Sequence, residues 1–70
     1  MAKARSLESR LYGAAVVKMS FRLRGAEGSP AFAGIYPGVL RDLELDDDAV
    51  ERYIQEHRAA VEAAARGSAP

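Results

Sequence analysis

The most regular stretch of the chain is DDDAVERYIQEHRAAVEAAAR, which spans residues 46–66. Its apolar side chains, with one histidine among them, recur three and four positions apart, and this spacing places them on one face of an α-helix. The members of this face are Val50, Tyr53, Ile54, His57, Ala60, Val61 and Ala64. The pattern predicts a long amphipathic helix from Asp46 to about Arg66, ended by Gly67.

Three consecutive aspartates mark the start of this helix. Their side chains accept hydrogen bonds from the free N–H groups of a first turn and complement the helix dipole. Two positions for the cap remain open. With Asp48 as the cap, Glu51 completes a capping box. With Asp46 as the cap, Leu45 can pack against Val50 instead.

Upstream of the helix, the hydrophobic period changes to two between Ala15 and Arg24. The apolar set is Val17, Met19, Phe21 and Leu23, and the polar set is Lys18, Ser20, Arg22 and Arg24. Such alternation predicts a half-buried β-strand with one apolar face and one cationic face.

The segment between this strand and the helix is rich in glycine and proline. It predicts turns at Gly25–Gly28 and at Pro37-Gly38. Further short strands are expected at Ala31–Tyr36 and at Val39–Leu45, because apolar residues recur in both.

The ends of the chain carry weaker signals. Ser6 can cap a short helix that runs through Tyr12 and stops at Gly13, and an extended segment is the alternative. Residues 1–5 and 67–70 are polar or small, so we expect them to be loose.

Length and composition limit the class of protein. Seventy residues with 49% hydrophobic and 29% charged side chains indicate one small folded domain rather than a disordered chain. No apolar run approaches the roughly 18 residues that span a membrane, and the N-terminus lacks the apolar core of a signal peptide. We therefore expect an intracellular, cytoplasmic protein.

Together the elements predict a single α+β domain over residues 1–70. In it, a two- or three-stranded antiparallel sheet is covered by the long C-terminal amphipathic helix, with a short N-terminal helix in addition. One helix leaves sheet edges and apolar surface uncovered, so we expect a homodimer. The residues expected at the dimer or partner interface are Phe32, Ile35, Tyr36, Tyr53, Ile54, His57 and Val61.

Basic residues concentrate in the first half of the chain. Residues 1–35 hold six basic and two acidic side chains, whereas residues 36–70 hold four basic and eight acidic ones. The cationic face of the predicted strand carries Lys18, Arg22 and Arg24. One hypothesis is that these three side chains contact DNA phosphates. The alternative is an exposed strand face whose charges protect an edge against aggregation.

The sequence carries no signature of an enzyme, a metal site or a cofactor. The absence of cysteine excludes disulfides, a thiol nucleophile and cysteine-type zinc sites. His57, the only histidine, has no serine or cysteine beside it in the sequence to form a nucleophile–base pair, which favours a packed or interface histidine. Ser6, Ser9 and Ser20 stay open as partners that the fold could bring to it. The aspartate run lacks the alternating ligands and central glycine of a calcium loop.

Two segments resemble a bacterial domain family long catalogued as of unknown function. Gly28–Gly34, with the sequence GSPAFAG, is similar to the family's G-x-P-x-F-x-G segment, and Tyr53–Arg58 followed by Val61-Glu62 is similar to its closing helix. The chain departs from the family at Ile35-Tyr36, where the family has Thr-Arg. Family members are encoded beside PIN-domain toxins and are regarded as antitoxins, so the resemblance implies a DNA-binding, toxin-neutralising role.

Two functions are therefore expected, from different classes. The first is a non-enzymatic, antitoxin-like regulatory module that acts as a dimer and contacts DNA phosphates, a protein partner such as a toxin, or both. The second is a structural or accessory subunit that packs on a larger protein and has no role with nucleic acid.

Overall fold

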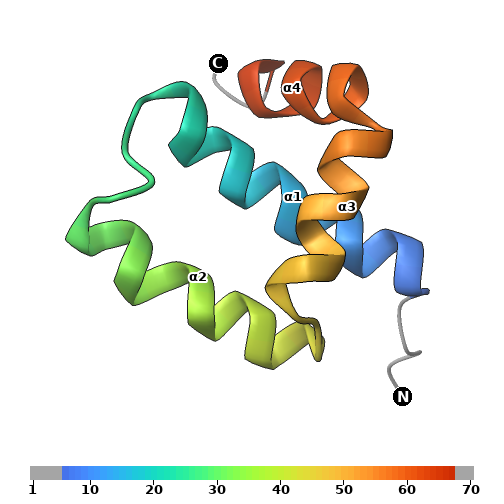
Figure 1. Cartoon of the computed structure of the whole chain (residues 1–70), viewed down its shortest axis with the longest axis horizontal. Helices are drawn as coiled ribbons and strands as arrows, with labels where there is room; N and C mark the ends of the chain where they lie inside the picture. The colour runs from blue at the N-terminus through green and yellow to red at the C-terminus, as the bar shows by residue number, and fades with distance from the viewer. Residues whose placement is uncertain (1–5, 68–70) are drawn as a thin grey trace.

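The computed structural model describes residues 6–67, and this part of the chain contains four helices and no strand (Figure 1). The helices are α1 (Leu7–Leu23), α2 (Pro30–Leu43), α3 (Asp47–Glu56) and α4 (Arg58–Gly67). The predicted α+β fold with an antiparallel sheet is therefore wrong. The predicted loose segments 1–5 and 68–70 lie outside the described residues, and Gly67 is the last residue of α4.

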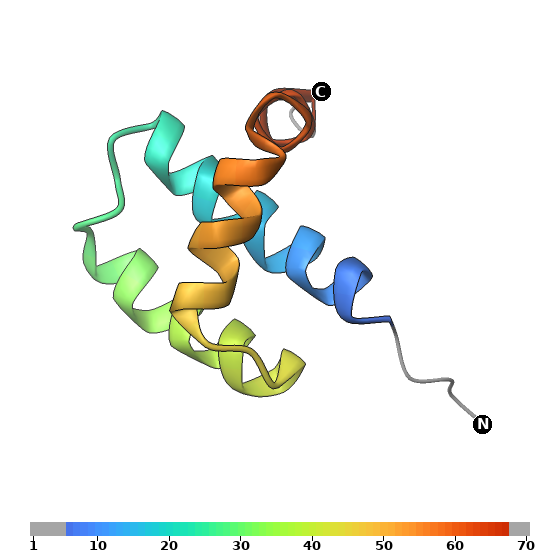
Figure 2. The same ribbon diagram turned by 45° about the vertical axis from the view of Figure 1, so that its right-hand side comes forward.

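α1 is the helix on which the others pack. It contacts α2, α3 and α4, and α3 also contacts α4. In Figure 1, α2 lies below α1 and α4 lies above it, and α3 crosses in front of α1 from the end of α2 to the start of α4. The chain turns sharply between α3 and α4, so that Figure 2 views α4 end-on while α3 runs across the picture.

The predicted strand from Ala15 to Arg24 is instead the second half of α1. Its buried side chains follow a helical spacing that begins further upstream, and they are Ala14, Ala15, Lys18, Met19 and Phe21. Lys18 belongs to this buried face although it is charged. Because a lysine is counted as polar in the sequence, the segment was interpreted as an alternating strand. The predicted start at Ser6 is confirmed, because its Oγ accepts a hydrogen bond from the Ser9 N–H at 3.1 Å. Gly13 does not stop the helix.

α2 replaces both predicted short strands and the turn predicted at Pro37-Gly38. Ser29 caps it by accepting the Phe32 N–H at 3.2 Å, and Pro30 follows at the first helical position, where a proline loses no hydrogen bond. Pro37 lies inside the helix on its exposed side. The predicted turn at Gly25–Gly28 is confirmed, with Gly25 at a φ of +69° that glycine adopts without strain.

The predicted start of the long C-terminal helix is confirmed, but the prediction of one continuous helix is wrong. Asp46 is the cap, and its Oδ1 accepts the Ala49 N–H at 2.8 Å. The helix then breaks at His57, whose φ of −128° and ψ of 35° are not helical. After the break Val61 and Ala65 are buried, whereas Ala60 is exposed. The two halves run in different directions (Figure 2), and both pack on α1.

The core lies where α1 meets the other helices. Its buried members are Ala14, Ala15, Met19, Tyr36, Val50, Tyr53, Ile54, Val61 and Ala65. The two alanines in the middle of α1 are fully buried, and their small side chains let neighbouring helices approach closely. Within residues 6–67, no helix is long and apolar enough to cross a membrane.

The two isoleucines provide a matched test of this packing. Ile54 is 3% exposed and Ile35 is 49% exposed. Ile54→Ala should lower the free energy of unfolding by about 2–5 kcal/mol, because it leaves a cavity in the core. Ile35→Ala should change it by less than about 0.5 kcal/mol. Urea denaturation of both variants measures the difference, and equal losses would contradict the packing.

Candidate functional site

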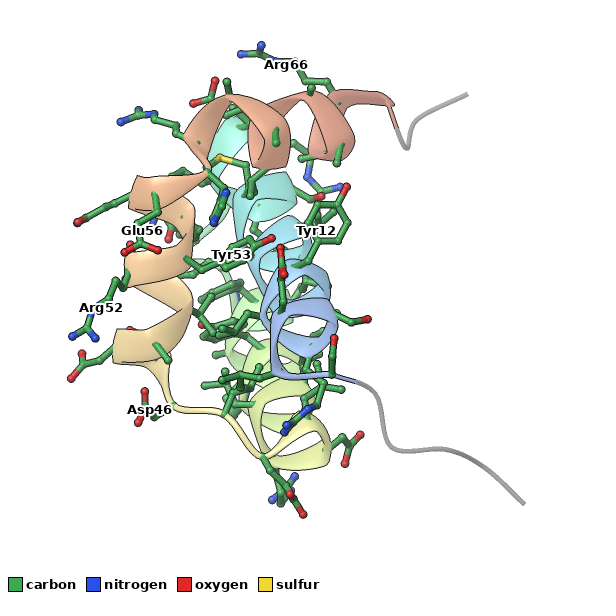
Figure 3. The ribbon with its side chains drawn as sticks, turned by 90° about the vertical axis from the view of Figure 1, so that its right-hand side faces the viewer. Tyr12, Asp46, Arg52, Tyr53, Glu56 and Arg66 are labelled. Atoms are coloured by element: carbon green, nitrogen blue, oxygen red, sulfur yellow. The ribbon has the colours of Figure 1, made fainter. Side chains whose placement is uncertain are left out.

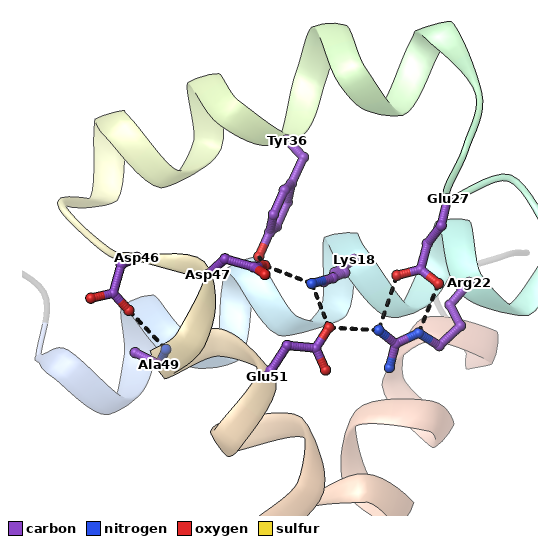
Figure 4. A network of polar contacts seen from close by, with 8 residues as sticks. All are labelled: Lys18, Arg22, Glu27, Tyr36, Asp46, Asp47, Ala49 and Glu51. Carbon is purple, nitrogen blue, oxygen red and sulfur yellow. Dashed lines mark hydrogen bonds and ion pairs between the residues drawn. The ribbon is translucent and has the colours of Figure 1, made fainter.

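The three cations predicted to bind nucleic acid do not form an open basic face. Lys18 is only 6% exposed. Its Nζ donates to Asp47 Oδ1 at 2.6 Å and also forms an ion pair with Glu51 (Figure 4). Lys18 therefore already has two carboxylates from α3 of the same chain.

Arg22 is held in the same way. Its guanidinium donates two hydrogen bonds to Glu27, at 3.0 and 2.9 Å, and one to Glu51 at 2.7 Å. Arg24 is the C-cap residue that follows α1, and its guanidinium lies 4.9 Å from the centre of the Phe21 ring. The predicted common face of Lys18, Arg22 and Arg24 is therefore absent.

Tyr36 completes this polar network from α2. Its hydroxyl donates to Asp47 Oδ1 at 2.7 Å (Figure 4). Burial raises the pKa of Tyr36 well above its usual range, and the hydrogen bond to Asp47 adds to this effect. The network thus joins α1, α2 and the first turns of α3 through neutral and charged hydrogen bonds.

The charged members of the network stabilise one another's ionised forms. Burial disfavours the Lys18 ammonium, but the hydrogen bonds and charges of Asp47 and Glu51 outweigh it and raise its pKa. Hydrogen bonds from Lys18, followed by Tyr36, lower the pKa of Asp47. The hydrogen bond from Lys18 also lowers the pKa of Glu51 below its usual value, against the effect of burial. The network is a structural element, because its charges already face one another.

Glu51 and Glu62 allow a matched test of the network, since each pairs with an arginine. Glu51 also forms an ion pair with the buried Lys18, whereas the ion pair of Glu62 with Arg58 lies on the surface of α4. Glu51→Gln should lower the free energy of unfolding by about 1–3 kcal/mol. Glu62→Gln should cost about 0.5 kcal/mol or less. Denaturation at neutral pH measures both, and a Glu51 effect no larger than that of Glu62 would show that the network does not hold the helices.

The network also predicts how stability depends on pH. Asp47 and Glu51 have lowered pKa values in the folded chain. Near the ordinary pKa values of these groups, 3.8 and 4.5, the folded state therefore binds fewer protons than the unfolded state does. The stabilisation is complete above these ordinary values and is lost as pH falls through the lowered ones. The free energy of unfolding should therefore fall on acidification, and Glu51→Gln should reduce the slope. An unchanged slope would contradict the assignment.

Most of the predicted interface residues are core residues. Tyr36, Tyr53, Ile54 and Val61 are buried, and Phe32 is half-buried between the rings of Phe21 and Tyr36. Ile35 and His57 are exposed, so these two are available to a partner.

Ile35 lies on the outer side of α2, where no residue from Pro30 to Gly38 is charged. Arg41 borders this surface, and a Cβ at Gly38 would lie 3.9 Å from its Nη2. No charged residue occurs between Glu27 and Arg41. The exposed or half-exposed residues of this outer face of α2 are Pro30, Ala31, Ala33, Gly34, Ile35, Pro37 and Gly38. A Cβ added at Gly34 would meet no atom within 4 Å, so the space above the backbone is open.

His57 lies at a second surface feature, an open hollow of about 490 Å³ between the start of α1 and the junction of α3 with α4. Its lining residues are Ser6, Glu8, Ser9, Tyr12, Tyr53, His57 and Ala60. The Tyr12 and Tyr53 rings meet edge to face with centroids 6.5 Å apart (Figure 3), and the His57 ring is 4.3 Å from that of Tyr53. We call this feature the aromatic hollow.

Glu8 and Tyr12 were not among the residues predicted at a site, because the predicted short helix at residues 6–12 had no partner element to pack against. A helix capped at Ser6 places both on its first turns, and only packing against α3 brings Tyr12 to Tyr53. Within residues 6–67, no group of three or more histidine, aspartate or glutamate side chains is arranged to hold a metal ion.

Comparison with known proteins adds no relative. No protein-family model, no curated protein and no solved structure matches the chain. The resemblance to the antitoxin family stays a prediction, and the function has to be argued from the two surface features.

Proposed function

We propose that the chain is a small, non-enzymatic binding module that docks on a larger protein through the outer face of α2. The observation that carries the proposal is an exposed helix face without charge on a chain in which 29% of residues are charged. Exposed apolar surface that is rimmed by polar residues is typical of protein interaction sites.

The geometry of the face favours insertion into a groove. Proline, alanine and glycine dominate it, so the helix backbone can approach a partner closely. Ile35, on one flank, is the one large apolar side chain of the face, and at 49% exposed it can serve as the anchor. Helices that bind in apolar grooves use such an anchor on one face.

A larger partner fits this face better than a second copy of the chain. From Pro30 to Gly38 the helix is only about 14 Å long and about 10 Å wide. A stable interface takes roughly 800 Å² from each partner, and two such narrow faces packed together fall short of that area. A groove on a larger protein can cover the sides of α2 as well as its outer face, and so can bury more area. The predicted homodimer stays a prediction, which sedimentation equilibrium tests directly.

The DNA contact predicted for the antitoxin-like module has less support than the protein contact. Lys18 and Arg22 face carboxylates of their own chain, and phosphate binding would have to compete with those ion pairs. A toxin of the PIN-domain class remains one candidate for the larger partner, since the resemblance implies it. The protein-binding role does not depend on that identity.

The experiment is a pull-down with the tagged chain from the native host's lysate, with and without nuclease, using Ile35→Glu and a matched control. Leu7→Glu is that control, because Leu7 is an equally large apolar residue, 56% exposed, at the start of α1. One protein should be retained in near-equal amounts by the unmodified chain and by Leu7→Glu regardless of nuclease. Ile35→Glu should retain at least about tenfold less.

The retained protein is then identified and titrated in purified form against the three chains. Equal affinity of Ile35→Glu and Leu7→Glu would show that α2 is not the docking face. Retention of nucleic acid alone, lost on nuclease treatment and steeply weakened by salt, would replace the proposal with the DNA-binding one.

A further inference from the structure

The aromatic hollow is a separate surface from the outer face of α2. Its base is Tyr53, which is only 8% exposed, and its rim is Tyr12, which is 41% exposed. Figure 3 shows the two tyrosines on the same side of the molecule, where α1 passes α3. With the His57 ring beside Tyr53, three aromatic rings from two separate segments of the chain meet at this hollow.

Among the described residues that line the hollow, the charge is negative. Glu8 is the one carboxylate there, and none of these residues is a lysine or an arginine. Burial raises the pKa of the Tyr53 hydroxyl, and the negative charge of Glu8 raises it further. The Glu8 contribution shows that its carboxylate is close enough to Tyr53 to act on a charge placed there.

An anion is a poorer occupant than a cation. The hollow adjoins the start of α1, where free N–H groups attract anions in many proteins. Here the Ser9 N–H donates to Ser6 Oγ, and the Arg10 N–H donates to the Ser6 carbonyl at 3.0 Å. Of the free donors in this first turn, the Ser9 N–H is therefore already satisfied, and Glu8 would repel an anion.

We propose that the aromatic hollow binds an organic cation, an ammonium or guanidinium head group, between the tyrosine rings and the Glu8 carboxylate. Aromatic faces attract such cations through their quadrupole, and quaternary ammonium groups are held by several rings together with a nearby negative charge. The volume of about 490 Å³ accommodates such a head group.

The test uses choline and its uncharged isostere 3,3-dimethylbutan-1-ol, which has the same shape. Binding is followed by the NMR resonances of the Tyr12, Tyr53 and His57 rings in the full-length chain. Choline should shift these resonances saturably, and the alcohol should bind at least about fivefold more weakly, which is the worth of one cation–aromatic contact. Equal binding of the two probes would overturn the proposal, since the hollow would then be merely apolar.

Three variants assign the binding to the proposed groups. Tyr12→Leu keeps an apolar side chain but removes the ring, and Glu8→Gln removes the charge, so each should weaken choline binding about two- to fivefold. Tyr12→Phe retains the ring and should restore most of the affinity. Glu44→Gln, an exposed glutamate outside the hollow, is the control and should have no effect. Unchanged affinity in both Tyr12→Leu and Glu8→Gln would overturn the proposal.

N-acetyl-lysinamide and N-acetyl-argininamide then distinguish the source of the cation. Tighter binding of either than of choline would indicate a basic side chain of a protein. Tighter binding of choline would indicate a free quaternary ammonium compound. Failure of all three probes overturns the inference without affecting the docking face of α2, because the Ile35→Glu experiment measures a different surface.

Discussion

The packing of the helices depends on the buried ammonium of Lys18. A charged side chain that is removed from water is stable only if opposite charges accompany it, and removing a partner from such a group is costly. The carboxylates of Asp47 and Glu51 lie four residues apart on α3, and Lys18 and Arg22 lie four residues apart on α1. Because the spacing is equal, Lys18 faces Asp47 and Arg22 faces Glu51. This matching fixes where α3 crosses α1, which apolar packing alone specifies less sharply.

The same network explains why the chain offers few free charges near its centre. The Tyr36 hydroxyl donates a hydrogen bond to Asp47, and this bond ties α2 to α1 and α3, the two helices that carry the ion pairs. Two other features of the described surface are the uncharged side of α2 and the aromatic hollow. Both functional proposals rest on those two places. They lie on different helices, so a protein partner and a small cation could bind at the same time.

The sequence misled the analysis at α1 for a physical reason. Residues four apart share a face in a strand and in a helix alike, so Lys18 and Arg22 belong together under either interpretation. What separates the two interpretations is the environment of Lys18. Counted as polar, it completes a strand pattern, whereas counted as buried, it completes a helical one with Ala14 and Ala15. No local feature of a lysine reveals that its partners will arrive from a segment about thirty residues later.

Two helix starts were determined by the sequence alone, because an N-cap is a local interaction. Ser6 and Asp46 each accept a hydrogen bond from an N–H three residues ahead, and the chain between them need not be folded for this preference to act. The turn at Gly25 is local for the same reason. Tertiary structure alone decided the class of the fold, the break at His57 and the meeting of Tyr12 with Tyr53. Each of these depends on contacts between segments far apart in the chain, whose free energies outweigh the local preference of any single residue.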